Sequence, residues 1–148
     1  MQMKGRLVIF DLDGTLALNE HRQHYVARPT GKKDWDLFFD ACDKDVLNWP
    51  IAATLLTMLA AGVDVRIWSG RTDRVREKTE RWLSENGLGH IPLKMRPEGD
   101  HRQDTMLKAE WLNEASQKPM MVFDDRDSVV EMWRENGIVC AQVAPGNF

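Results

Sequence analysis

The sequence predicts an α/β fold, a doubly wound, Rossmann-like parallel sheet with helices on both faces. Three observations lead to this prediction: short apolar runs that are followed by polar residues, amphipathic stretches between these runs, and Gly or Pro residues near many of the junctions. Strands that are buried on both faces of a parallel sheet appear as apolar runs. Because strands alternate with helices along the chain, we expect right-handed crossovers between parallel strands.

The first half of the chain contains two predicted strands and the helix between them. Residues 7–10 are wholly apolar and predict a buried strand. Pro50 suits the first turn of a helix, residues 52–59 place apolar side chains on one face, and Gly62 favours the helix end. Residues 63–68 then predict the second strand.

The next unit is a helix followed by a weaker strand. Asp73 can cap a second helix, whose apolar face includes Trp82 and which ends before Gly87. Residues 91–95 predict a third strand, although Pro92 lacks the backbone N–H that a central strand would use. The alternation of helix and strand therefore continues past the middle of the chain.

The last third of the chain repeats the pattern twice. A third helix is predicted from about Asp104 and is followed by an apolar strand at residues 120–123. Ser128 can cap a fourth helix that ends at Gly137, and residues 138–143 predict the final strand. Every strand after the first is thus preceded by a helix, as a doubly wound sheet requires.

Length and composition predict one compact domain that spans residues 1–148. The chain has 148 residues, of which 43% are hydrophobic and 29% are charged, and this excludes disordered and fibrous classes. Residues 17–48 break the rhythm of strand and helix, so we interpret them as an insertion that lies over one edge of the sheet. Trp35, Phe38 and Phe39 of the insertion can stack on a nucleobase, but their spacing favours a helix face packed onto the core.

Charge and cysteine content narrow the possible partners. A net charge of −3 argues against a protein that grips long DNA through its phosphates, although a short phosphate-bearing end remains compatible with it. Cys42 and Cys140 have no C-x-x-C spacing, so we expect two reduced thiols and no zinc site. The apolar start of the chain is too short for a signal sequence or a membrane span, and we expect a cytoplasmic protein.

Polar side chains follow or end the predicted strands. In chain order they are Asp11 and Asp13, Ser69 and Arg71, Arg96, and Asp124 with Asp125. Ligands of open parallel sheets bind beyond the carboxyl ends of the strands, so we expect these side chains to converge there. Clustered carboxylates repel one another and favour a hard cation with oxygen ligands, which predicts a Mg²⁺ site. Carboxylates around a metal, next to a hydroxyl and guanidiniums, are typical of phosphoryl transfer.

Four motifs in order resemble those of the haloacid dehalogenase (HAD) superfamily. They are D-L-D-G-T-L from Asp11, S-G-R-T from Ser69, Lys108 on a helix, and D-D-R-D from Asp124. The resemblance implies a HAD-type phosphatase in which Asp11 is the nucleophile that forms an aspartyl-phosphate and Asp13 is the general acid and base. It also implies that Ser69 and Lys108 bind the phosphoryl group. Thr15 is a candidate substrate-binding residue that can support the nucleophile through its hydroxyl or its backbone. The Mg²⁺ ligands that the resemblance implies are Asp11, the backbone carbonyl of Asp13, Asp124 and Asp125.

A narrower resemblance covers nearly the whole chain. The segments S-G-R-T-D, R-P-E-G-D-H-R-Q-D-T, D-D-R-D-S-V-V-E-M-W-R and Q-V-A-P-G-N-F are similar to the 3'-phosphatase domain of the polynucleotide kinase of phage T4. This resemblance implies a 3'-phosphate on a nucleotide or on a DNA or RNA end as substrate, with Arg71 and Arg96 as substrate contacts. The insertion is too short for a full cap domain, which favours an open site with a small cap or none.

Two alternatives remain open from the sequence. The first is a small-metabolite or 5'-nucleotide phosphatase of the same superfamily, in which Trp35 and its neighbours close over the ligand. The second is a catalytically idle binding module with this fold, which would act as the partner of a separate kinase or ligase. The intact pair of Asp11 and Asp13 argues against the idle module. Comparing hydrolysis of 3'- and 5'-monophosphates separates the two phosphatase hypotheses.

Overall fold

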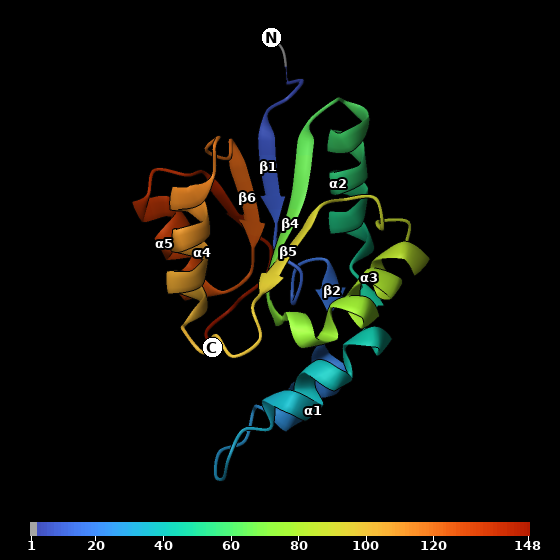
Figure 1. The fold of residues 1–148 in the computed structure, drawn as a ribbon, viewed down its shortest axis with the longest axis vertical. Coiled ribbons are helices and arrows are strands. Elements are labelled where there is room, and N and C mark those ends of the chain that lie inside the picture. The colour runs from blue at the N-terminus through green and yellow to red at the C-terminus, as the bar shows by residue number, and fades with distance from the viewer. Residues whose placement is uncertain (1–2) are drawn as a thin grey trace.

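A computed structural model describes residues 3–148, and its central feature is a five-stranded sheet in the order β5-β4-β1-β6-β7 (Figure 1). All four neighbouring strand pairs are parallel. The strands are β1 (Leu7–Phe10), β4 (Asp64–Thr72), β5 (Leu93–Arg96), β6 (Met121–Asp124) and β7 (Cys140–Gln142). The predicted doubly wound parallel sheet is therefore confirmed, with β1 at its centre.

Two helices cover each face of this sheet (Figure 1). Helices α2 (Trp49–Ala60) and α3 (Arg76–Glu85) lie on one side, and α4 (Asp104–Glu114) and α5 (Asp127–Glu135) lie on the other. No helix within residues 3–148 is both long enough and apolar enough to cross a bilayer. The layer arrangement places the carboxyl ends of all five strands at one end of the molecule.

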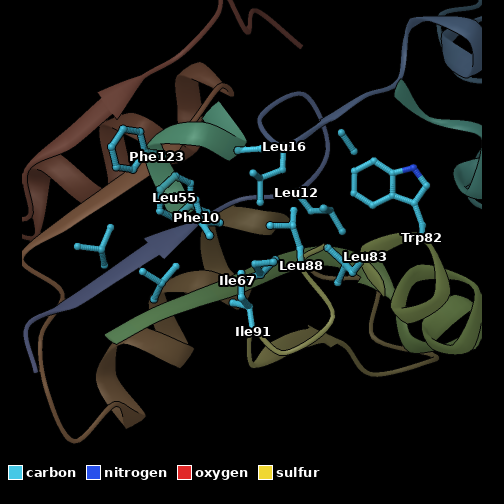
Figure 2. Close-up of a cluster of buried hydrophobic side chains, with 14 of the residues drawn as sticks. Phe10, Leu12, Leu16, Leu55, Ile67, Trp82, Leu83, Leu88, Ile91 and Phe123 are labelled. Atoms are coloured by element: carbon cyan, nitrogen blue, oxygen red, sulfur yellow. The ribbon is translucent and has the colours of Figure 1, made fainter. Parts of the chain in front are cut away.

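The sheet separates the two largest hydrophobic clusters of the core. Along β1, Val8 and Phe10 face the cluster beneath α2 and α3, whereas Leu7 and Ile9 face the cluster beneath α4 and α5. This alternation follows from the period of two in a strand. Figure 2 shows the first cluster, in which the Phe10 and Phe123 rings stack with centroids 4.5 Å apart. Both faces of the central strand are buried, which fixes the position of the residue that follows it.

Strand β4 is longer than the sequence predicts, because it continues to Thr72 rather than ending at residue 68. The extension pairs with β5 through an irregular register, Ser69 with Met95 and Thr72 with Arg96. Ser69 and Arg71 consequently lie within the strand rather than after it. Strand β5 covers residues 93–96 instead of 91–95, since Pro92 contributes only its carbonyl, which accepts a hydrogen bond from the Ile67 N–H.

Two predicted helix caps are wrong. The Thr72 side chain, rather than Asp73, accepts a hydrogen bond at the start of the 3-10 turn η3 (Asp73–Val75), while the Asp73 carboxylate accepts from the Glu98 N–H. Ser128 lies inside α5, which begins at Asp127. The last strand covers only residues 140–142 of the predicted 138–143, because the Ile138 N–H closes the end of α5 on the Trp133 carbonyl.

The insertion at residues 17–48 lies beyond the carboxyl ends of the strands, not over a sheet edge as predicted (Figure 1). Its ends form a small antiparallel pair, β2 (Ala17–Leu18) with β3 (Val46–Leu47). Between them lie η1 (Glu20–Tyr25), α1 (Trp35–Asp40) and η2 (Cys42–Lys44). Phe38 of α1 is buried and Phe39 is half-buried, as the preferred packing interpretation predicts, whereas Trp35 is 47% exposed.

Candidate active site

A cluster of three buried carboxylates lies at the carboxyl ends of the two central strands. Asp11 follows β1, and Asp124 and Asp125 stand at the end of β6. Their carboxylates offer one oxygen each, and these oxygens lie within 4.8 Å of one another. The apolar residues of β1 and β6 are buried against both helix layers, so the positions of these acids are set by the core of the fold.

Lys108 joins two of these acids from helix α4. Its Nζ donates to Asp11 Oδ1 at 2.8 Å and to Asp124 Oδ2 at 2.9 Å, and its side chain is 2% exposed. Burial alone would lower the pKa of Lys108, but the Asp11 and Asp124 carboxylates raise it above its usual value. The ammonium therefore stays charged and fixes the orientation of Asp11.

One ammonium does not compensate three carboxylates. Burial, and then the charge of Asp124, raises the pKa of Asp11 well above its ordinary value. The same two causes raise the pKa of Asp125 to about 6. A further cation with a preference for oxygen ligands fits this donor set, because it would relieve the repulsion between the acids. The cluster is therefore able to hold a divalent metal ion.

The turn after β1 brings Gly14 and Thr15 against the cluster. Gly14 has a φ of +78°, and a Cβ at this position would collide with Asp125 Oδ2. The Thr15 hydroxyl is buried and donates to Asp125 Oδ1 at 3.4 Å. The turn closes through the Gly14 N–H, which donates to the Ala17 carbonyl at 2.8 Å. Only glycine satisfies both the backbone conformation and the close approach.

Replacing Gly14 by Ala is expected to disturb Asp125 as well as the backbone. The matched control is Gly87→Ala, because Gly87 has nearly the same φ, +75°, and nothing within 4 Å of the position of a Cβ. Both variants carry backbone strain of about 1 kcal/mol, and Gly14→Ala carries overpacking of roughly 1–3 kcal/mol more. Urea unfolding measures the difference. Equal losses of stability in the two variants would contradict the close approach.

Asp13, two residues beyond Asp11, is held by two arginines. Arg71 Nε donates to Asp13 Oδ1 at 3.0 Å and Arg71 Nη2 donates to the same oxygen at 2.8 Å, while Arg22 also donates to this carboxylate. Burial would raise the pKa of Asp13, but the guanidiniums of Arg71 and Arg22 together lower it to about 2. Asp13 is thus an ionised carboxylate in a fixed orientation.

Asp45 holds the same two arginines from the other side. It accepts from Arg22 Nη2 at 2.6 Å and from Arg71 Nη2 at 2.9 Å, and its side chain is fully buried. His21 Nε2 lies 2.8 Å from Asp45 Oδ1 at the solvent-facing side of this group. The insertion therefore contributes Arg22 and Asp45, and through them it determines how Asp13 is oriented.

Sequence reasoning missed Arg22 and Asp45. Arg22 lies in a stretch, E-H-R-Q-H-Y, that is polar throughout, and Asp45 lies among other charged residues of the insertion. Neither residue belongs to a motif or to an apolar period, so no signal distinguishes them from solvated surface. His21, which neighbours Arg22 in the sequence, is partly exposed and contacts Asp45.

The remaining predicted site residues are Ser69, Arg71 and Arg96. Ser69 is buried, and its Oγ accepts from the Arg71 N–H at 3.1 Å. Arg71 is fully buried among Asp13, Asp45 and Thr79. Arg96 donates from Nε to the Gly70 carbonyl at 2.8 Å and pairs with Asp104. The expected contacts of Arg71 and Arg96 with a substrate stay predictions.

The sequence of this chain matches one protein family along nearly its whole length. The family model described as the polynucleotide kinase PNKP phosphatase domain matches residues 5–148. A putative bifunctional polynucleotide kinase/RNA ligase of Autographa californica nuclear polyhedrosis virus is 32% identical over 138 residues, which are 88% of this chain and 18% of the viral protein.

Solved structures agree with this match. A chain in the structure of a Pnkp1/Rnl/Hen1 complex is 36% identical, with a TM-score of 0.82, over 98% of this chain and 48% of that one. The class C acid phosphatase from Bacillus anthracis shares the fold at 16% identity, with a TM-score of 0.68, over 97% of this chain and 67% of that one. This chain thus spans about half or less of the length of the viral protein and of the chain in the Pnkp1/Rnl/Hen1 complex, which are each more than 30% identical to it.

Proposed function

This chain belongs to the family of polynucleotide kinase PNKP phosphatase domains within the HAD superfamily, and from that premise we propose that it removes a 3'-phosphate from a nucleotide or from a DNA or RNA end. One observation carries the phosphoryl-transfer chemistry, whereas the 3'-nucleotide substrate is inferred from the resemblance to polynucleotide kinase phosphatase domains. The carboxylate of Asp11 is fixed by Lys108 beside a cluster of acids that can hold a divalent metal, with a second fixed carboxylate, Asp13, two residues away. This is the set of groups that nucleophilic phosphoryl transfer needs.

In the proposed reaction Asp11 attacks the phosphorus atom. A bond forms between a carboxylate oxygen of Asp11 and phosphorus, and the bond from phosphorus to the ester oxygen breaks. Asp13 gives a proton to that oxygen, then takes one from the water that hydrolyses the aspartyl-phosphate, so that inorganic phosphate and a hydroxyl end are released. Its low pKa leaves Asp13 ionised, so the carboxylate is able to accept that proton. The negative charge of a phosphate ester beside Asp13 raises this pKa toward the range needed to give a proton to the ester oxygen.

The other groups of the site bind and orient the phosphoryl group in this proposal. Lys108 and Ser69 contact its oxygens, Thr15 holds Asp125, and Arg71 and Arg96 contribute positive charge on the substrate side. The carboxylates of Asp11, Asp124 and Asp125, with the backbone carbonyl of Asp13, are the proposed ligands of Mg²⁺. When bound, Mg²⁺ neutralises charge on the transferring phosphoryl oxygens.

The metal proposal predicts a Mg²⁺-dependent gain in stability. At a Mg²⁺ concentration about 100 times the dissociation constant, the folded state gains roughly 2.7 kcal/mol, which corresponds to several degrees in Tm. Asp125→Asn should lose this rise, whereas Asp43→Asn on the exposed part of the insertion should retain it. Differential scanning calorimetry with Mg²⁺ and with chelator measures the effect. An equal rise in both variants would place the ion elsewhere.

The substrate proposal is tested with matched phosphate esters. We expect phosphate release from a 3'-phosphorylated oligonucleotide and from a nucleoside 3'-monophosphate, and little from their 5' isomers or from a sugar phosphate. Activity only on 5'-nucleotides or sugar phosphates would replace this proposal by the small-metabolite alternative. Silence on all substrates, with Mg²⁺ present and the protein folded, would favour the idle binding module.

A partner activity is part of the proposal. The viral relative is described as both a kinase and a ligase, and the similar solved chain belongs to a complex with other proteins. We infer that this chain acts beside a separate kinase or ligase, for which a 3'-hydroxyl end is the chemically useful product. A cytoplasmic location stays a prediction.

A further inference from the structure

The last six residues lie directly against the acidic segment of the site. The Val143 N–H donates to the Asp124 carbonyl at 3.0 Å, and Gly146 exchanges hydrogen bonds with Asp127 through its N–H and its carbonyl. A Cβ at Gly146 would collide with the Asp125 carbonyl oxygen, so the backbone of the tail passes this close only because residue 146 is glycine. The tail is thus held at the rim of the site, where Figure 1 shows the chain end beside the carboxyl ends of the strands.

Arg126 and Phe148 meet at this rim. Arg126 Nε donates to the Phe148 carbonyl at 2.7 Å, and the guanidinium carbon lies 5.4 Å from the centre of the Phe148 ring. Phe148 is nevertheless 67% exposed as a residue, and the Arg126 side chain is 34% exposed. An aromatic ring and a guanidinium are therefore fixed next to each other while both keep surface available to a ligand.

Asp104 ties this pair to the catalytic residues. Arg126 Nη1 lies 3.4 Å from Asp104 Oδ2, and Asp104 stands one helical turn before Lys108 on α4. Asp104 Oδ1 also lies 2.7 Å from where a Cβ of Gly70 would be, immediately after Ser69. Arg126, which belongs to the fourth motif, is thereby linked through Asp104 to the helix that carries Lys108 and to the backbone of the second motif.

We propose that Arg126 and Phe148 form a binding platform for the nucleotide that carries the scissile phosphate. The Phe148 ring stacks on the terminal base, and the Arg126 guanidinium binds the backbone phosphate on the 5' side of that nucleotide. The inference rests on the proposed function, because it takes a 3'-phosphorylated nucleotide as its ligand. Exposed aromatic rings bind bases of any sequence, since every base has a π-face, so the platform selects a polymer end without reading its sequence.

Trp35, the other exposed aromatic considered for this role, has a different environment. Its ring stacks on Phe39 and meets the edge of Phe38, and the Lys33 ammonium lies 5.7 Å from its centre. It belongs to α1, on the insertion, and none of these contacts is to a residue of the four motifs. Trp35→Ala is therefore the matched control for removal of an exposed aromatic ring.

The stacking half of the proposal is tested with two 3'-phosphorylated oligonucleotides that differ only in whether the terminal nucleotide has a base. Phe148→Ala should raise KM for the base-bearing substrate roughly tenfold, leave kcat unchanged, and leave KM for the abasic substrate unchanged. Phe148→Tyr should retain the wild-type preference, and Trp35→Ala should not alter it. Equal losses on both substrates, or no loss on either, would overturn the stacking role.

The arginine half is tested with a substrate that lacks a second phosphate. Arg126→Gln should reduce the salt dependence of oligonucleotide binding by about one phosphate contact, and it should raise KM for the 3'-phosphorylated oligonucleotide more than KM for a nucleoside 3'-monophosphate, which has no such phosphate. Equal changes on both substrates would overturn the phosphate contact. A wild-type protein with no activity on either substrate would overturn the proposed function and the platform together, whereas an active wild type whose variants show no selective loss would overturn the platform alone.

Discussion

Replacing Asp11 by Asn should lower phosphate release from a 3'-phosphorylated oligonucleotide by at least about 10³-fold, and the protein should remain folded. The amide of Asn has the size of the carboxylate but cannot attack phosphorus to form an acyl phosphate. Folding should persist because Lys108 keeps its contact with Asp124 at 2.9 Å, and the apolar clusters on either side of the sheet are untouched. Steady-state phosphate release and the denaturant midpoint give the two readouts.

The control for this substitution is Asp64→Asn. Asp64 starts β4 at the opposite end of the sheet and pairs with Arg66 at the surface. This variant removes one carboxylate from the protein without touching the acidic cluster, so its activity should equal that of the wild type. If Asp11→Asn kept its activity, or if both variants lost it equally, Asp11 could not be the nucleophile.

Replacing Arg22 by Ala should impair both turnover and stability. The variant removes one of the two guanidiniums that fix Asp13 and leaves Asp45 with fewer partners in a fully buried position. Breaking a buried ion pair from one side costs about 3 kcal/mol or more. The loss of orientation at Asp13 should lower kcat by roughly 10²-fold. The fall should appear in kcat rather than in KM, because Arg22 acts through Asp13 and not on the substrate.

Two further variants separate positioning from simple loss of charge. Arg22→Lys keeps the charge but cannot hold both carboxylates with a planar fork, so it should recover stability better than turnover. Arg74→Ala removes a partly exposed arginine that pairs with Asp40 and should change neither quantity appreciably. A normal kcat in Arg22→Ala would show that Asp13 does not depend on the insertion.

The alternation of strands and helices could be predicted because it depends on local patterns. A buried strand can be predicted from its own residues, as at 7–10. A helix end can be predicted from the glycine beside it, and the glycines at three helix ends, Gly62, Gly87 and Gly137, each have a positive φ. The length of β4 could not be predicted, since its last residues are polar and stay extended only by pairing with β5. The predicted cap at Asp73 is wrong because Thr72 takes this role and the Asp73 carboxylate accepts from the Glu98 N–H. The one at Ser128 is wrong because α5 already begins at Asp127.

The acidic part of the site was predictable for a topological reason. Residues that follow buried parallel strands meet at one end of the sheet, so Asp11 and Asp124 had to converge whatever the loops did. Arg22, Asp45 and the tail glycine Gly146 could not be found in this way. Their positions depend on how the insertion and the chain end fold back on the strand ends. No local pattern of apolar residues predicts these long-range contacts.

The most direct test of Asp11 as the nucleophile follows the phosphate through the reaction. Wild-type protein and Asp13→Asn are mixed with an oligonucleotide that carries a radiolabelled 3'-phosphate, quenched in acid during turnover, and digested for peptide mapping. We expect label on the peptide that contains Asp11 in the wild type, and slower labelling in Asp13→Asn, because this variant lacks the group that protonates the leaving oxygen. We also expect none from the 5'-labelled isomer. Label on another residue, or 3'-phosphate hydrolysis that never labels Asp11, would contradict this role of Asp11.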